Sequence, residues 1–280
     1  MQDVVCLYYI DSDTKVDMSN FERIDYQVEN QVAYIRLNQP DILNAMSGEM
    51  GQEIMQALEM GEHEARAIVL GSHGRAFCSG ANLSGGGNID LNDPQRDMGI
   101  RLERIFNPMF LKIRDLPVPF ITSVRGPAVG FGSGLALMGD IIIASETAFF
   151  LQTFCKIGLA PDGAAAYLMS RSIGRIKAME LMLLGERYHA EQAYQDGLVT
   201  RLVEDSELDE VTTTIAEKLA SGPPISLGLI RRSAWAALDS SFPEQLARER
   251  DEQRLAGRTE DFIEGVAAFR EKRKANFSGK

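Results

Sequence analysis

The stretch GPAVGFGSGLALMGD, residues 126–140, decides how the chain is interpreted, because it places four glycines within nine positions. It follows the apolar run FITSV and leads into an apolar segment typical of a helix. Closely spaced glycines between a strand and a helix let a ligand approach the backbone. The N–H groups of a first helical turn have no partner within the helix and carry partial positive charge. The stretch therefore predicts a site for a negative group, with donors between Phe131 and Ser133.

The spacing of these glycines disfavours two phosphate-binding motifs. Counted from Gly130 the pattern is GxGxG, whereas a dinucleotide loop has GxGxxG and belongs to a first βαβ unit. The sequence GK[ST] of a P-loop is missing. A dinucleotide oxidoreductase therefore remains only a weak alternative.

A second candidate donor lies in GRAFCSGANLSGGG, residues 74–87, just past the strand-like AIVLGS. Gly80 and Ala81 are small, so the N–H of Ala81 is open to a ligand, although such loops are also common as structural turns. Two amides from separate loops form an oxyanion hole, which stabilises a carbonyl oxygen that becomes negative during a reaction.

A candidate acid, Asp162, follows Leu159, Ala160 and Pro161 and precedes a run of alanines. A carboxylate in apolar surroundings has a raised pKa, which suits proton transfer. The same residue is also a good N-cap for the following helix-like segment. Local sequence leaves both interpretations open.

Composition excludes several classes of function. The 280 residues carry a formal net charge of -11, so phosphate backbones are repelled and nucleic acid is not an expected partner. No apolar stretch approaches the roughly 20 residues of a membrane-spanning helix, and three cysteines without CxxC spacing favour the cytoplasm. His63, His73 and His189 share no ligand spacing, so no metal is expected.

The order of segments predicts an α/β fold with a partly parallel sheet. Alternating residues within 21–40 are typical of a β-hairpin, 94–116 has helical periodicity, and strand, helix and strand patterns then repeat. We expect an N-terminal extension over 1–20, a core over 21–206 and a helical region over 207–280. The apolar stripes of these last helices indicate oligomerisation rather than a lid.

Several collinear segments resemble the crotonase superfamily, the enoyl-CoA hydratase/isomerase family, over about residues 20–280. They are LNQPDILNAMS, AFCSGANL, RGPAVGFGSGLALMGDIIIAS, KIGLAPDGAA, RIKAMELMLLGERYHAEQAYQDGLVTRLV and RDEQRLAGRTEDFIEGVAAFREKR. This resemblance implies a spiral of ββα turns whose C-terminal helices form a homotrimer or a dimer of trimers.

The resemblance also implies which groups meet the substrate. The thioester oxygen of an acyl-CoA would accept hydrogen bonds from the backbone amides of Ala81 and Phe131, so the negative group is an enolate. The CoA thioester is the substrate, and neither a cofactor nor a metal is implied. Further substrate-binding positions are Asn44, Ala45, Cys78, Gly80, Asn82, Leu83, Gly132, Phe154, Phe269 and Lys272, the last two reaching CoA from a neighbouring subunit.

The hydratases of this family use two glutamates, at positions that here hold Gly134 and Phe154. Simple hydration of a 2-enoyl-CoA is therefore not expected. Asp162 falls where several isomerases and the aryl-CoA dehalogenase branch place a functional aspartate. The chain is most similar to the branch of ring-epoxide isomerases of phenylacetate degradation.

These points predict an acyl-CoA isomerase of fatty acid or aromatic catabolism. Asp162 would move a proton between carbons while the amides of Ala81 and Phe131 stabilise the enolate. The alternatives are an enoyl-CoA hydratase with one acid, a hydrolase or dehalogenase with Asp162 as nucleophile, and a noncatalytic acyl-CoA-binding protein.

Overall fold

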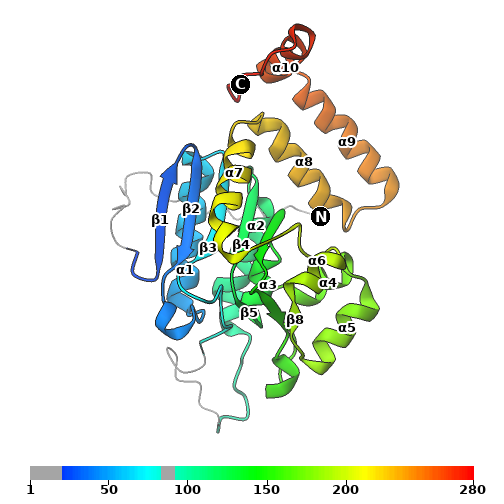
Figure 1. The fold of residues 1–280 in the computed structure, drawn as a ribbon. Coiled ribbons are helices and arrows are strands. Elements are labelled where there is room, and N and C mark those ends of the chain that lie inside the picture. The colour runs from blue at the N-terminus through cyan, green and yellow to red at the C-terminus, as the bar shows by residue number, and fades with distance from the viewer. Residues whose placement is uncertain (1–20, 83–91) are drawn as a thin grey trace, which may run out of the picture.

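In the computed structural model of the chain, residues 21–82 and 92–280 are described, and their strands form two sheets (Figure 1). The larger sheet has the order β1-β2-β3-β4-β6-β9, in which only the β1–β2 hairpin is antiparallel. The smaller sheet has the order β5-β7-β8. The predicted hairpin and the predicted partly parallel sheet are both confirmed. The strands are β1 Ile24–Glu29, β2 Val32–Leu37, β3 Ala67–Ser72, β4 Phe120–Val124, β5 Pro127–Val129, β6 Ile141–Ser145, β7 Phe149–Leu151, β8 Tyr188–His189 and β9 Arg201–Val203.

Alternating side chains of the larger sheet pack against helices on both of its faces. On β2, Ile35 and Leu37 belong to the core that includes α1, Gly48–Glu64. Tyr34 points to the other face, which is covered by α7, Leu208–Ala220. The sheet is therefore enclosed between helices, as the near-continuous apolar character of its strands requires.

The helix predicted over 94–116 begins later in the structure, at Ile100. The side chains of Asp93 and Asp97 accept hydrogen bonds from the N–H groups two residues further on, at 2.8 and 2.7 Å. Such local bonds stabilise turns in competition with a helix. The early part of the prediction was therefore wrong because aspartate turns replace the first helical turns.

A π-helical turn, Leu102–Phe106, leads directly into α2, Asn107–Asp115. Pro108 has no N–H to donate, and the N–H of Asn107 bonds to the carbonyl of Leu102, five residues back. This turn brings the ring centroid of Phe106 to 4.5 Å from the ring centroid of Phe131. The irregular helix thus packs against the glycine-rich segment.

The chain advances from the larger to the smaller sheet in three successive turns. β4 is followed by β5 and β6 by β7, while β3 is followed by Cys78, which pairs with Ala128 of β5. These second-layer segments lie side by side, because Cys78 pairs with β5 and β5 pairs with β7. Residues that follow each of them therefore meet at one edge.

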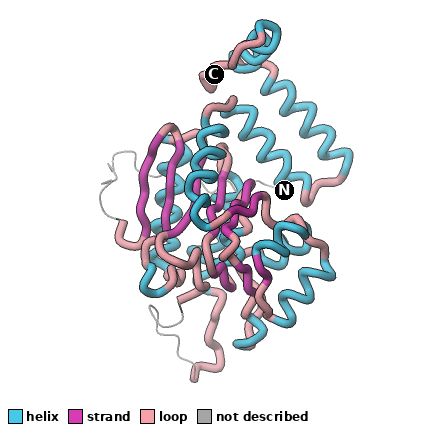
Figure 2. Tube along the Cα trace, viewed as in Figure 1, coloured by secondary structure: helices cyan, strands magenta, loops and turns pink. Residues whose placement is uncertain are grey.

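The four predicted C-terminal helices are confirmed, and Figure 2 shows α8 to α10 extending away from the strands. They are α7 with α8 Pro224–Ala237, α9 Phe242–Ala256 and α10 Glu260–Glu271, and the remaining helices are α3 Phe131–Ala136, α4 Ala165–Ser172, α5 Arg175–Leu184 and α6 Ala190–Gln195. Short 3-10 turns cover Pro40–Ile42, Phe154–Ile157 and Asp205–Glu207. None of the helices in the described ranges has the length and apolar character needed to cross a membrane.

A buried arginine connects the helical region to the core. Arg231 of α8 pairs with Asp140 at 2.6 Å and donates to the carbonyls of Ile113, Arg114 and Leu116. Asp140 also accepts the N–H of Phe120 at 2.8 Å. Asp140 is thus a structural residue. The division at residues 206 and 207 stays a prediction, and the extension over 1–20 lies outside the described residues.

Candidate active site

Two backbone segments carry the predicted donors, and they run parallel to each other. The N–H of Cys78 donates to the carbonyl of Pro127 at 3.1 Å, and the N–H of Val129 donates to the carbonyl of Cys78 at 2.9 Å. Parallel segments advance one residue for one. The Cys78–Ala128 pair thus brings the segment that leads to Ala81 beside β5, which leads to Phe131.

Glycines allow these segments to approach closely. Gly80 has a φ of +99°, and a Cβ there would lie 3.0 Å from the carbonyl oxygen of Val129. A Cβ on Gly132 would lie 2.5 Å from the carbonyl oxygen of Cys78. Side chains at either position would push the two segments apart, so the glycines predicted to bind substrate also shape the site.

The amides of Ala81 and Phe131 have no hydrogen-bond acceptor within residues 21–82 and 92–280. Phe131 is the first residue of α3, where no intrahelical acceptor exists. The N–H of Ser133, in contrast, returns to the carbonyl of Gly130 at 3.0 Å. Of the predicted donors between Phe131 and Ser133, only those of Phe131 and Gly132 are therefore free within the described residues. The oxyanion-binding role of the Ala81 and Phe131 amides stays a prediction.

The side chain of Phe131 anchors the helix that carries this amide. It is 2% exposed, and its ring lies 4.5 Å from the ring of Phe106 and 5.4 Å from that of Phe110. Phe131 can therefore offer its N–H while its ring is fixed in the core.

Asp162 is half-buried, and its carboxylate receives no hydrogen bond from the described residues. Burial, without a compensating partner, raises the pKa of Asp162 to about 6. Helix α4 has Ala164 as its N-cap and no side-chain cap, so the alternative in which Asp162 caps this helix is wrong. An uncompensated carboxylate of this pKa is suited to exchange protons near neutral pH.

The backbone after Asp162 lies directly on α3. Gly163 and Ala164 both adopt left-handed conformations, with φ values of +58° and +57°. The Cβ position of Gly163 is 3.4 Å from the carbonyl oxygen of Phe131, and that of Gly134 is 2.1 Å from the carbonyl oxygen of Gly163. Asp162 is therefore one residue away from a contact with the helix that presents the Phe131 amide.

The two positions that hold glutamates in the hydratases provide no acid here. A side chain at Gly134 has no room, because its Cβ would overlap the carbonyl of Gly163. Phe154 is buried, and its ring tip lies 3.5 Å from the Cβ position of Gly130. The packing around α3 excludes a glutamate at position 134 in this conformation.

Asn44, one of the predicted substrate-binding residues, is fully buried and has backbone partners. It accepts the N–H of Gln39 at 2.8 Å and donates to the carbonyls of His73 and Ala76 at 2.9 and 2.8 Å. Its side chain therefore fixes the loop before α1 against the loop after β3.

The neighbouring predicted residues line the same loops. Ala45 is half-buried, and the N–H of Asn82 donates to the carbonyl of Met46 at 2.8 Å. Burial raises the pKa of the Cys78 thiol to about 12, which excludes a thiolate nucleophile near neutral pH. Leu83 lies outside the described residues.

Phe269 and Lys272 lie at the end of α10, which Figure 1 places at the top of the molecule, far from α3 in the main body. Phe269 is 85% exposed, and Lys272 is exposed as well. The chain does not bring these two residues to its own site, so their contact with CoA stays a prediction that requires a second copy.

One buried hydrogen-bonded pair of polar side chains was not predicted from the sequence. The side-chain amide of Gln152, directly after β7, donates to the hydroxyl of Ser133 in α3 at 2.9 Å. The available signal was a glutamine directly after the apolar run AFFL.

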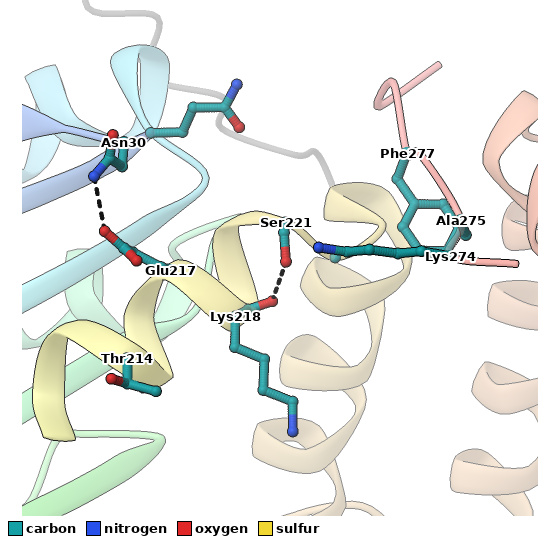
Figure 3. A pocket seen from close by; sticks show the side chains of 10 residues that line it. Asn30, Thr214, Glu217, Lys218, Ser221, Lys274, Ala275 and Phe277 are labelled. Carbon is teal, nitrogen blue, oxygen red and sulfur yellow. Dashed lines mark hydrogen bonds between the residues drawn. The ribbon is translucent and has the colours of Figure 1, made fainter.

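A cavity of about 750 Å³ lies elsewhere, between the β1–β2 turn, α7 and the C-terminal segment (Figure 3). Its lining includes Asn30, Lys218 and Lys274 and none of the predicted site residues. It therefore does not bear on the interpretation of Asp162 and the two amides.

Comparison with known proteins agrees with the fold and the order of the motifs. The family model described as enoyl-CoA hydratase/isomerase matches residues 27–280. The chain is 40% identical to 1,2-epoxyphenylacetyl-CoA isomerase of Escherichia coli K12 over 90% of this chain and 97% of that protein. It is 34% identical to mitochondrial enoyl-CoA hydratase of Pongo abelii over 92% and 89%, respectively. The crystal structure of enoyl-CoA hydratase from Bacillus anthracis superposes with a TM-score of 0.86 at 28% identity, covering 92% of this chain and 100% of that one.

Proposed function

Because the chain belongs to the enoyl-CoA hydratase/isomerase family, we propose that it is an acyl-CoA isomerase in which Asp162 carries the proton. The observation that supports this most is the environment of the Asp162 carboxylate. It is half-buried, it has no hydrogen-bond partner among the described residues, and its pKa is raised to about 6. The amides of Ala81 and Phe131 would stabilise the negative thioester oxygen.

The proposed reaction needs one acid/base group. The Asp162 carboxylate accepts a proton from the carbon next to the thioester carbonyl, and the C–H electron pair forms the enolate double bond. The oxygen takes the carbonyl π electrons and is stabilised by the two N–H groups. Return of the same proton to a different carbon, such as the fourth carbon of a 3-enoyl chain, completes the isomerisation without adding water or a cofactor.

The similarity to 1,2-epoxyphenylacetyl-CoA isomerase supports a ring-epoxide or an unsaturated acyl group as the substrate. A hydratase is the second candidate, because mitochondrial enoyl-CoA hydratase is also similar. The position of Gly134 argues against it, since a second carboxylate has no room there.

A panel of acyl-CoA thioesters in deuterated buffer separates these functions. We expect products of unchanged composition, apart from deuterium at the two carbons between which Asp162 moves the proton, in those turnovers in which the Asp162 proton exchanges with the solvent. A product heavier by one water would identify a hydratase, and release of free CoA would identify a hydrolase. Binding of CoA esters without any turnover or exchange would support the noncatalytic alternative.

We also propose a homotrimer or a dimer of trimers. The C-terminal helices expose large apolar side chains, including Phe242, which is 76% exposed, and Phe269, which is 85% exposed. Burial of such residues between copies is favourable. Light scattering of the purified protein tests this, and a monomer at micromolar concentration would contradict it.

The pH dependence of the reaction follows from Asp162. A base must be deprotonated before it accepts a proton, so kcat/KM is expected to rise about tenfold per pH unit below the Asp162 pKa of about 6 and to level off above it. Rates between pH 4.5 and 8 with one isomerised substrate would check this. An acidic limb centred near pH 4 would show that Asp162 is not the base or is not buried in the free enzyme.

A further inference from the structure

The pair Gln152 and Ser133 lies next to the proposed oxyanion-binding amide and is part of no function described above. Gln152 is 2% exposed and Ser133 is fully buried. The bond from Gln152 Nε2 to Ser133 Oγ measures 2.9 Å. It joins the end of β7 to the first turn of α3, which begins with Phe131.

Two consecutive residues of the chain hold both sides of Phe131. The carbonyl of Leu151 accepts the N–H of Gly130 at 2.7 Å, on the residue before Phe131. The side chain of Gln152 bonds Ser133, two residues after Phe131. The Phe131 amide is thus bracketed between two hydrogen bonds from the same end of β7.

Within this helical turn, the carbonyl of Gly130 accepts the N–H groups of Ser133 and Gly134, and the turn's remaining contacts with distant segments are steric. Gly132 abuts Cys78, Gly134 abuts Gly163, and the Phe131 ring packs on phenylalanines. Steric contacts prevent closer approach but resist sliding and rotation weakly, whereas a hydrogen bond is directional. The bonds from the end of β7 therefore help to fix the direction of the Phe131 N–H relative to the rest of the site.

The second polar atom of the Gln152 side chain, Oε1, is buried and has no hydrogen-bond partner in the described part of the chain. A half-satisfied buried amide is not a favourable way to stabilise a fold. A similar apolar side chain would fill this place without that cost, so the function of the amide has to be sought in the bond that it makes.

We propose that Gln152 is a positioning residue, which holds the first turn of α3 through Ser133 so that the Phe131 N–H points at the thioester oxygen as it becomes negative. The inference rests on the proposed function, because it requires that this amide binds the oxygen. Stabilisation of an oxyanion depends on donors about 2.7–3.1 Å from the charged oxygen, so a small rotation of α3 weakens it.

Gln152→Met, Gln152→Asn and Ser133→Ala test the proposal. Methionine keeps the length without the amide, asparagine keeps the amide but is one methylene too short, and alanine removes the acceptor. We expect each to lower kcat by about 10- to 100-fold, with KM within about threefold of the unmodified protein. Gln152→Met combined with Ser133→Ala should lower kcat no further than either alone, because all of them remove the same bond.

A spectroscopic measurement detects the oxyanion contact without turnover. The infrared band of butanoyl-CoA labelled with carbon-13 at its thioester carbonyl is expected to shift to lower frequency on binding. About half of that shift should be lost in Gln152→Met and in Ser133→Ala, since one of two donors is misdirected. The melting temperature of Gln152→Met should change little, whereas Ser133→Ala leaves the buried Gln152 amide without a partner and should lower it by a few degrees. The acidic limb of the pH profile should stay at the Asp162 pKa in both variants.

The outcomes separate the two proposals. If the unmodified protein is active and Asp162→Asn is not, while all three variants keep kcat and the carbonyl shift, the positioning role is wrong and the isomerase proposal stands. A loss of activity that only accompanies a large fall in melting temperature, with an unchanged carbonyl shift, would assign Gln152 to the fold and overturn the inference. If the unmodified protein neither turns over nor binds any acyl-CoA, both proposals fail.

Discussion

Asp162→Asn is expected to lower isomerase turnover by about 10³-fold and, at pH 8, to raise the free energy of unfolding by about 1–2 kcal/mol. The loss of turnover follows because a carboxamide cannot take up and return the proton. The side chains have nearly the same shape, so KM should change little. Steady-state kinetics and thermal unfolding of the same preparations measure both effects.

The gain in stability follows from the direction of the pKa shift. Burial raises the pKa of Asp162 from 3.8 to about 6 in the folded chain. Between these values the folded state holds a proton that the unfolded state has lost, so the free energy of unfolding falls as pH rises through this range. Above pH 6 the folded protein carries the full cost of the buried charge. Full conversion of the shift gives about 3 kcal/mol, which we reduce because the carboxylate is partly exposed.

Asp140→Asn is the matched control. The side chain of Asp140 is 22% exposed, but it is paired at 2.6 Å with the buried Arg231, so its replacement should lower the melting temperature and leave the isomerase pH profile unchanged. Equal turnover of Asp162→Asn and the unmodified protein would refute the proposed mechanism. Unchanged or reduced stability of Asp162→Asn at pH 8 would show that its carboxylate is solvated.

Gly134→Ala is expected to lower the free energy of unfolding by about 3 kcal/mol, equivalent to a fall in melting temperature of about 6–10 °C. The added Cβ would lie 2.1 Å from the carbonyl oxygen of Gly163, so α3 and the segment that carries Asp162 must separate. A displacement of this size next to reacting groups should also lower kcat by at least about 10²-fold. Gly134→Glu should lower the free energy of unfolding and kcat further than Gly134→Ala, and it should not produce hydratase activity.

Gly71→Ala provides the comparison for this effect. Gly71 is also buried, in β3, but a Cβ there would meet Ser123 at 3.6 Å, an ordinary contact. Its melting temperature and turnover should stay close to those of the unmodified protein. Full activity of Gly134→Ala would mean that the Asp162 segment can move away from α3 without loss of function.

The local sequence predicts many of the helices and strands, because the pattern of apolar residues along each of them follows its own period and its own buried face. The alternation in β2 and the stripes of the C-terminal helices each report which face is buried, and the structure confirms these elements. The glycines around Phe131 likewise predict a helix start with free amides, and two N–H groups there have no described acceptor.

The remaining features depend on contacts between distant segments. The sequence around Gly134 does not predict that Gly163 lies against it, and the sequence around Gln152 does not predict its hydrogen bond to Ser133. The cap and acid interpretations of Asp162 are equally compatible with its neighbours in sequence. The left-handed conformation of Ala164 and the missing side-chain cap rule out the cap interpretation, and the acid interpretation stays a prediction.

The three turns that connect the two sheets have a consequence for how such an enzyme can diversify. The segment after Cys78 and the one after β5 each end in a main-chain donor that has no acceptor among the described residues, whereas the residues after β7 offer side chains. A main-chain N–H is kept in any substitution except one to proline. A side-chain group, in contrast, is lost or altered when its residue is replaced. If the two amides bind the thioester oxygen as proposed, new reactions can evolve through changes in the third turn while the first two turns keep that contact.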